Sequence, residues 1–193
     1  MSKKVYTRLI MHFGVGNMLK VFRCWICGET YLGEEEPTDC PYCGADREFL
    51  KPGEEYELPD VELTEKSREN LEEALELEVD NATFYYCAYN KAEGPKTEGM
   101  FKRLAKVESE HAEAICLFLD VEEPEIDKKI EKCAEELPDN IKDAHSRESR
   151  AIKHYRKFAQ EAEEPRVKEF FEALVEIETD HLELHESELE KLN

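Results

Sequence analysis

The sequence contains no apolar run approaching the roughly 20 residues of a membrane-spanning helix, and its N-terminus lacks the apolar core and cleavage site of a secretory signal. It is also poor in positive charge, with 26 basic against 47 acidic residues and a formal net charge of -21. Nucleic acids and anionic membrane surfaces are bound through clustered Lys and Arg, so this balance argues against both as partners. We therefore expect a cytoplasmic protein.

Glycine and proline are scarce, with eight of each in 193 residues, and their positions divide the chain. Residues 1–20 match no pattern, and Met18 is a candidate natural start. Residues 21–50 are punctuated by Gly and Pro and bear paired cysteines, which predicts a small metal-organised module with little helix. Residues 51–63 are expected to be a linker. From Thr64, a residue type favoured at helix N-caps, the pattern is helical throughout 64–193.

Within 64–193 we expect four long helices, at about 64–93, 96–120, 139–162 and 166–191. Pro95, Pro138 and Pro165 lie near three of the helix starts, where a missing N–H costs least. The connections inside the first and the second pair are very short, so each pair should form an antiparallel hairpin. The stretch 121–138 is longer, is expected to be partly helical, and can cross the bundle. The predicted fold class is mainly α, a four-helix bundle preceded by a small β module.

An internal repeat relates the two predicted hairpins through a shift of 70 residues. Two hairpins of one pattern, packed about an approximate two-fold axis, would bring matching side chains to a common centre. The matched polar pairs are Glu78 with Glu148, Tyr85 with Tyr155, Glu108 with Glu178, and His111 with His181.

These matched residues have the composition of a two-metal site. Residues three apart share a helix face, so each Glu-x-x-His pair, Glu108 with His111 and Glu178 with His181, forms a chelate. With one further Glu from each preceding helix, the set equals the ligand pattern of di-iron and di-manganese carboxylate bundles. Tyr85 and Tyr155, two turns beyond Glu78 and Glu148, are expected to donate to the ligand carboxylates.

The competing interpretation is a solvated charged face, since a chain rich in Glu produces Glu-x-x-His by chance. Only two of the six histidines have Glu three positions earlier, and the repeat relates those two, which favours the metal site. The remaining helical histidines, His145, His154 and His185, are not assigned to the site.

Seven cysteines fall into two groups. Two C-x-x-C-G knuckles separated by twelve residues predict a tetrahedral four-sulfur metal site, and four thiolates accept zinc as readily as iron. The scattered cysteines are expected to be small apolar fillers of the bundle. The predicted ligands are Cys24, Cys27, Cys40 and Cys43, and the scattered residues are Cys87, Cys116 and Cys133.

Together the two parts resemble the rubrerythrin family, over nearly everything after residue 20. FRCWICGETYLGEEEPTDCPYCGADREF resembles its rubredoxin-like domain, and VESEHAEAICLFL and IETDHLELHESEL resemble its two Glu-x-x-His helices. The rubredoxin-like part comes first, as in reverse rubrerythrins. The implied fold is a ferritin-like four-helix bundle preceded by a rubredoxin-like or zinc-ribbon-like β module.

The resemblance also implies an activity. The four cysteines would hold one redox-active iron in preference to zinc, and the six Glu and His residues would hold a di-iron pair. The protein would be a peroxidase that reduces hydrogen peroxide to water, supplied with electrons by an external donor such as rubredoxin or an NAD(P)H-linked reductase. Family members often form dimers in which one chain's rubredoxin-like domain lies near the other chain's bundle, so we expect a homodimer.

One position departs from the family. Rubrerythrins commonly carry an extra glutamate on the third bundle helix that exchanges with a histidine as the metals change oxidation state, and this chain has Ala151 there. The site is therefore expected to be closer to a symmetric ferritin-like pair. A ferritin-like iron oxidase or metal-handling protein is the alternative function, and a zinc-stapled bundle used only for binding ranks last.

Overall fold

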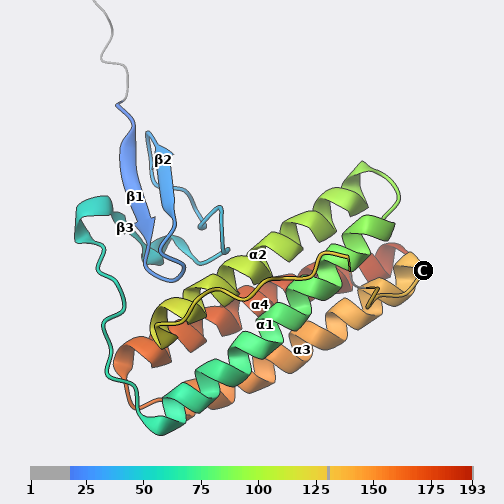
Figure 1. The fold of residues 1–193 in the computed structure, drawn as a ribbon. Coiled ribbons are helices and arrows are strands. Elements are labelled where there is room, and N and C mark those ends of the chain that lie inside the picture. The colour runs from blue at the N-terminus through green and yellow to red at the C-terminus, as the bar shows by residue number, and fades with distance from the viewer. Residues whose placement is uncertain (1–17, 130, 193) are drawn as a thin grey trace, which may run out of the picture.

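The computed structural model describes residues 18–129 and 131–192. Most of the expected N-terminal extension, residues 1–17, lies outside the described residues, and Met18 is the first of them. A small three-stranded module precedes four long helices, and the predicted fold class is confirmed (Figure 1). Each helix agrees with its expected span within two residues at both ends. The helices are α1 (Glu65–Lys91), α2 (Pro95–Leu119), α3 (Leu137–Glu161) and α4 (Pro165–Lys191).

Local capping explains where the helices begin. The Thr64 side chain accepts a hydrogen bond from the Ser67 N–H and so caps α1. Proline occupies the first turn of each of the other three helices, where its missing N–H has no intrahelical partner to lose. At the far end of α2, Asp120 turns the chain out of the helix in the left-handed conformation, with φ of 54°.

The segment between α2 and α3 corrects one expectation. We expected partial helix over 121–138, but the described residues between Asp120 and Glu136 form neither helix nor strand. A helix over the whole of 120–136 would span only about 25 Å, whereas the 25 residues of α2 rise about 37 Å. The segment runs along the bundle from the end of α2 to the start of α3, so much of it has to be extended (Figure 1).

A disulfide corrects a second expectation. Cys87 on α1 is bonded to Cys133 of the crossing segment, so these two residues are not simple apolar fillers. Cys116 remains a buried free thiol, as expected. The disulfide fixes the crossing segment to α1. Asn140 of α3 holds the same segment, because its side chain accepts a hydrogen bond from the Ala134 N–H and donates one to the Ala134 carbonyl.

The module is a three-stranded antiparallel sheet in the order β2-β1-β3. Its strands are β1 (Lys20–Cys24), β2 (Thr30–Gly33) and β3 (Leu50–Pro52). The end of β3 and the 3-10 turn at Gly53–Glu55 continue the module into the range 51–63, which was expected to be linker.

The core of the bundle continues into the module. One buried cluster joins Ile26, Cys43 and Ala45 of the module to Phe118 of α2 and Ile177 of α4. The module therefore packs on the bundle of its own chain, beside α2 (Figure 1). No helix in the described ranges is both long and apolar enough to cross a membrane.

Candidate metal centres

The four predicted cysteines of the module converge. Their sulfur atoms lie within 4.8 Å of one another, and all four side chains are buried. The Cys24 and Cys43 sulfurs are 3.7 Å apart, and those of Cys27 and Cys40 are 3.8 Å apart. A tetrahedron with metal–sulfur bonds of about 2.3 Å has sulfur–sulfur edges of about 3.8 Å, so these residues fit one metal ion.

Glycine makes each knuckle possible. Gly28 and Gly44 have φ of 78° and 89°, values that L side chains rarely adopt. Each donates its N–H to the carbonyl of the first cysteine of its knuckle, Cys24 or Cys40, at 2.9 and 3.0 Å. The turns direct both cysteines of a knuckle toward the same point.

The four helices bring all six predicted Glu and His residues together in the middle of the bundle. Ligand atoms of Glu78, Glu108, His111 and Glu178 lie within 4.8 Å of one another, and so do those of Glu108, Glu148, Glu178 and His181. The carboxylates of Glu108 and Glu178 belong to both groups. Each group adds one further Glu and one His to these two shared carboxylates, so the residues would hold two adjacent metal ions.

Six polar atoms of this cluster fit metal ions because they have no hydrogen-bond partner in the protein. Both oxygens of Glu108, one oxygen each of Glu78, Glu148 and Glu178, and Nδ1 of His111 are buried and lack a hydrogen-bond partner. Such atoms carry a large desolvation cost unless something positive neutralises them. Two divalent ions would supply that charge to four carboxylates.

The pKa values of the clustered Glu and His residues also show that this site favours bound positive charge. Burial, followed by repulsion from Glu108 and Glu178, raises the pKa of Glu148 well above its ordinary value. Burial alone would lower the pKa of His111 and His181, but the surrounding carboxylates raise both well above the ordinary value. Without metal the cluster therefore holds protons, and metal loading must displace them.

Both predicted tyrosines meet the carboxylates, each across the bundle. Tyr155 Oη donates to Glu78 Oε1 at 2.6 Å, and Tyr85 Oη donates to Glu148 Oε1. Burial and the neighbouring carboxylates raise the pKa of both hydroxyls well above the ordinary value, so both stay protonated.

One residue at this centre was missed from the sequence. His185 is fully buried, and its Nε2 lies 2.8 Å from Tyr85 Oη and 3.6 Å from Glu148 Oε1. Its spacing of one helical turn after His181 was the available signal, but the repeat places Ile115 at the matching position. His145 and His154 lie outside the site and face Glu186 and Glu73.

Comparison with known proteins agrees with this geometry. Residues 69–189 match the family described as "Rubrerythrin". The chain belongs to the rubrerythrin family. Residues 22–51 match "Rubrerythrin, rubredoxin-like domain", so the rubredoxin-like domain precedes the rubrerythrin bundle.

The chain is also similar to one curated protein. "Reverse rubrerythrin-1" of Clostridium acetobutylicum is 32% identical over 110 residues, which cover 49% of this chain and 59% of that protein. The chain thus spans less than two thirds of the relative's length. No solved structure matches the chain.

Two further features of this rubrerythrin bundle bear on its chemistry. Ala151 is buried on α3 one turn after Glu148, so the described site has no additional carboxylate at that position. His111 Nε2 lies 3.1 Å from the carbonyl oxygen of Cys43, on the side of the ring opposite the carboxylates. A single hydrogen bond therefore joins a candidate ligand of the two-metal site to a candidate ligand residue of the four-sulfur site.

Proposed function

We propose that this chain is a non-haem di-iron peroxidase that reduces hydrogen peroxide to water with electrons relayed through an Fe(Cys)4 centre. The observation that carries the proposal is the 3.1 Å contact between His111 Nε2 and the Cys43 carbonyl. It gives electrons a short route of one residue and one hydrogen bond between the two sites. A purely structural zinc module has no use for such a contact.

In this proposal, Glu78, Glu108, Glu148 and Glu178 with His111 and His181 hold two irons, which supply two electrons when reduced. Reduction of one peroxide consumes these two electrons and two protons and releases two waters. The buried carboxylates would neutralise the bound ions, and Glu108 and Glu178, which belong to both ligand groups, would be within reach of both ions.

Tyr85 and Tyr155 hold protons at the edge of the site. Each hydroxyl is buried and donates to the carboxylate of the opposite hairpin, Glu148 or Glu78. The two hydroxyls fix the orientation of those carboxylates and carry protons next to the site. Protons that peroxide consumes are replaced through them.

The remaining parts of the proposal concern cofactor and partners. Iron is proposed at the four cysteines because zinc has no redox chemistry, and a relay requires it. An external one-electron donor, rubredoxin or an NAD(P)H-linked reductase, restores the Fe(Cys)4 centre. We place the protein in the cytoplasm and retain a homodimer as its proposed assembly.

Anaerobic turnover tests the proposal. The iron-loaded protein is reduced, mixed with hydrogen peroxide, and followed by its visible spectrum while a reduced rubredoxin is supplied. We expect peroxide to oxidise the two-iron site, and the Fe(Cys)4 centre then to oxidise and be reduced again by the donor. Oxidation of the two-iron site without any electron arriving from the Fe(Cys)4 centre would contradict the peroxidase assignment.

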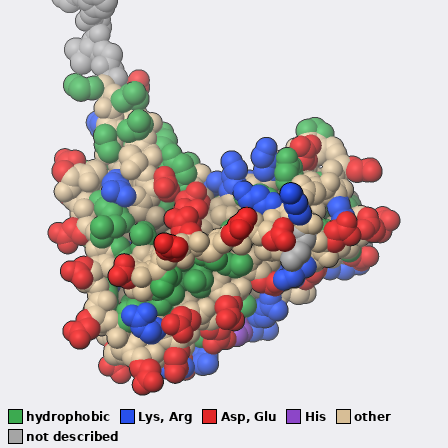
Figure 2. All heavy atoms as spheres, viewed as in Figure 1, with side chains coloured by type: hydrophobic (Ala, Val, Ile, Leu, Met, Phe, Trp, Pro, Cys, Tyr) green, Lys and Arg blue, Asp and Glu red, His purple; other side chains and the backbone are tan. Residues whose placement is uncertain are grey.

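A ferritin-like iron oxidase is the second candidate, favoured by Ala151 and by the acidic surface. Acidic side chains spread over both module and bundle on the visible face (Figure 2) and would attract ferrous ions. Here ferrous iron is the substrate and oxygen the oxidant. Catalytic oxidation of many ferrous ions per chain, with no dependence on a donor, would favour this function.

A further inference from the structure

The disulfide between Cys87 and Cys133 has one buried and one accessible partner. Cys87 lies on α1 with 3% of its surface exposed, whereas Cys133 is partly exposed on the crossing segment. Thiol–disulfide exchange begins when a thiolate attacks the sulfur that it can reach. The bridge can therefore be attacked from the side of Cys133.

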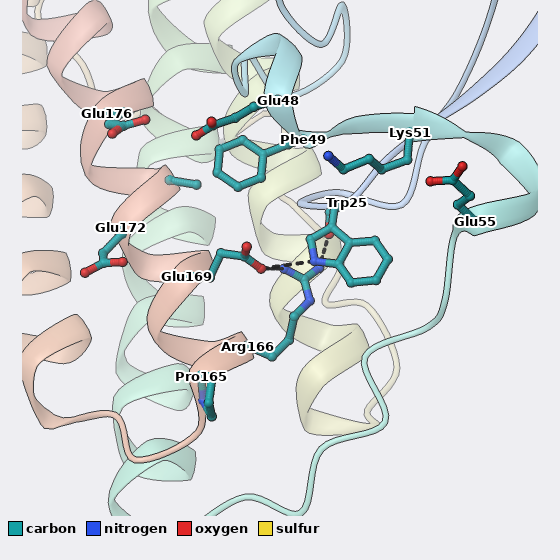
Figure 3. A pocket seen from close by; sticks show the side chains of 11 residues that line it. Trp25, Glu48, Phe49, Lys51, Glu55, Pro165, Arg166, Glu169, Glu172 and Glu176 are labelled. Carbon is teal, nitrogen blue, oxygen red and sulfur yellow. Dashed lines mark hydrogen bonds and ion pairs between the residues drawn. The ribbon is translucent and has the colours of Figure 1, made fainter.

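The accessibility of Cys133 sets it apart from the other cysteines. Among the residues that the structure describes, which include all seven cysteines, Cys133 alone is not buried. In the module even Trp25, inside the first knuckle, is covered. Its Nε1 donates to Glu169 Oε2 at 3.0 Å, and Arg166 lies over its ring at 4.6 Å (Figure 3). A thiol reagent in solution should therefore meet Cys133 before any other sulfur.

A cavity of about 370 Å³ lies next to the bridge, between α1 and the crossing segment. Its lining includes residues that closely follow one or the other cysteine in the sequence, namely Ala88, Lys91 and Glu135. Pockets of roughly 300–1,000 Å³ hold small molecules in proteins. The structure thus provides room for a reactant beside the two sulfurs.

Lys91 places a positive charge near both cysteines. It lies one helical turn after Cys87 on α1, and its Nζ donates to the Cys133 carbonyl at 3.4 Å. Lys91 also pairs with Glu135 at 2.5 Å, but its side chain is 19% exposed and that of Glu135 is 80% exposed, so the ammonium is the more buried charge. A nearby cation stabilises a thiolate, which is both the attacking and the leaving form in exchange.

Both sequence neighbours of Cys133 are held without the help of the bridge. Lys132 Nζ pairs with Asp80 of α1 at 2.9 Å. The Asn140 side chain bonds the N–H and the carbonyl of Ala134 at 2.8 and 3.0 Å. The two Cα atoms of the bridge lie 5.8 Å apart, and these contacts would keep them close after reduction. The bridge can therefore open and close again without a rearrangement of the bundle.

We propose that Cys87 and Cys133 form a second redox site, which hydrogen peroxide oxidises and a dithiol protein of the thioredoxin class reduces. In the oxidation, the Cys133 thiolate attacks one peroxide oxygen and breaks the O–O bond, which gives a sulfenic acid and a hydroxide that takes up the thiol proton. The Cys87 thiol then attacks the sulfenic sulfur, and the bridge forms as water leaves. Two thiols and one peroxide thus yield one disulfide and two waters.

In the reduction, a thiolate of the dithiol protein attacks the Cys133 sulfur, and Cys87 leaves as the thiolate. The second thiol of that protein then releases Cys133, so the electron pair comes from the partner, which ends as a disulfide. A reversible bridge suits the proposed cytoplasmic location, where lasting disulfides are rare and those that form are typically catalytic or redox-sensing. The site goes beyond the proposed function, because it uses no metal.

Reduction of the native protein is the first test. Full-length protein is loaded with zinc, so that neither metal site exchanges electrons, and is incubated with reduced thioredoxin. After an acid quench, the free cysteines are alkylated and located by peptide mass spectrometry. We expect Cys87 and Cys133 to be alkylated in nearly all chains, while the emission of Trp25, the single tryptophan, stays unchanged. A bridge that thioredoxin reduces only after the protein is unfolded is purely structural, and this result would overturn the proposal.

Reaction with peroxide is the second test. The reduced zinc-loaded protein, freed of thioredoxin, is mixed with hydrogen peroxide, and the bridge should return with one peroxide consumed per chain. In Cys87→Ala the reaction stops at the sulfenic acid, so dimedone should label Cys133. Survival of both thiols in peroxide would also overturn the proposal. Because no iron is present, the result does not depend on whether the iron-loaded chain reduces peroxide, and a failure there would refute only the proposed function.

Single-cysteine variants test which sulfur reacts. Cys87→Ala leaves Cys133 free, and the matched variant Cys133→Ala leaves Cys87 free. In folded zinc-loaded protein, Cys133 should react with a chromogenic disulfide about tenfold faster or more, because it is the exposed partner. In the Cys87→Ala background, Lys91→Gln should slow this reaction roughly two- to fivefold, whereas Lys142→Gln, at an exposed position on α3, should not. Equal rates for the two cysteines would overturn attack at Cys133, and an unchanged rate in Lys91→Gln would overturn the role of Lys91.

Discussion

The first hairpin, α1 and α2, and the second, α3 and α4, supply matched ligand candidates but surround them differently. His111 is fully buried against the Cys43 carbonyl, whereas its repeat partner His181 is 9% exposed. Tyr85 contacts both Glu148 and His185, whereas Tyr155 donates to Glu78. The duplicated pattern therefore accounts for two matched metal positions, and the residues outside it make the two sides of the site different, with the four-cysteine module on the side of His111.

The largest expected effect comes from removing either imidazole. Because His111 and His181 each complete one metal position, His111→Ala and His181→Ala should each lower the iron content by roughly one ion per chain. His111→Ala should also loosen the module, since it alone loses the Cys43 contact, and so increase acrylamide quenching of Trp25. Metal analysis and fluorescence of the zinc-loaded proteins measure the two effects. Equal quenching in both variants would show that His111 does not hold the module.

The disulfide is a second difference between the hairpins. Cys87 is bonded to Cys133, but the repeat places the exposed Lys157 at the matching position of α3. The bridge closes a loop with a sequence separation of 46, so Cys87→Ser should lower the free energy of unfolding by about 2–4 kcal/mol. Denaturant unfolding of metal-free protein measures this change.

Two controls sharpen the disulfide experiment. Cys116→Ala alters a buried free cysteine on α2 and should cost much less, since it opens no bridge. Reductant should bring the wild-type protein close to Cys87→Ser and leave that variant unchanged. If reductant does not change the unfolding midpoint of the wild type, the bridge does not contribute to stability.

A pH experiment isolates His185, which has Ile115 as its counterpart. Burial, followed by the charge of His181, lowers the pKa of His185 from 6.5 to about 4. Between these values the unfolded chain binds a proton that the folded chain does not, so stability is lost as the pH falls from about 6.5 to about 4. The loss from this residue is about 3 kcal/mol.

His185→Gln provides the comparison, because glutamine has no group that titrates in this range. The difference in unfolding free energy between the metal-free wild type and the variant should change by about 3 kcal/mol as the pH falls from about 6.5 to about 4. The variant Ile115→Val, at the matching position of the first hairpin, should follow the wild-type pH dependence. A pH-independent difference between wild type and His185→Gln would mean that the folded protein protonates His185 normally.

The fold was predictable because its signals are local and periodic. Helical patterning, prolines at helix starts and the short hairpin connections gave four helices within two residues of their ends. The six ligand candidates were found because each lies at a helical spacing and recurs after 70 residues. Both cues are readable without knowing what lies across the bundle.

What escaped prediction depends on contacts between distant segments. The extended course of the crossing segment depends on the distance between the ends of α2 and α3, and the bond between Cys87 and Cys133 depends on where that segment passes α1. No local pattern encodes either. His185 lies at a readable spacing, but its role is set by Tyr85, 100 positions away in the sequence. The attachment of Trp25 to Arg166 is likewise a property of how module and bundle pack.

The smallest expected effect compares the two tyrosines. Tyr85→Phe removes the contacts of the hydroxyl with both Glu148 and His185, whereas Tyr155→Phe removes only the contact with Glu78. Each lost buried hydrogen bond costs about 1 kcal/mol, so the metal-free Tyr85→Phe variant should be less stable than Tyr155→Phe by about that amount.

Denaturant unfolding at neutral pH measures the difference between these two variants, and Tyr89→Phe, at a partly exposed position on α1, is the control and should change stability little. The result also tests how the two sides of the site differ. If His185 holds Tyr85, then in a His185→Gln background the cost of Tyr85→Phe should fall toward that of Tyr155→Phe, since one of its two contacts is already altered. Equal costs for the two tyrosines in the wild-type background would mean that the contact with His185 contributes nothing, and the two hairpins would then differ only where His111 meets the module.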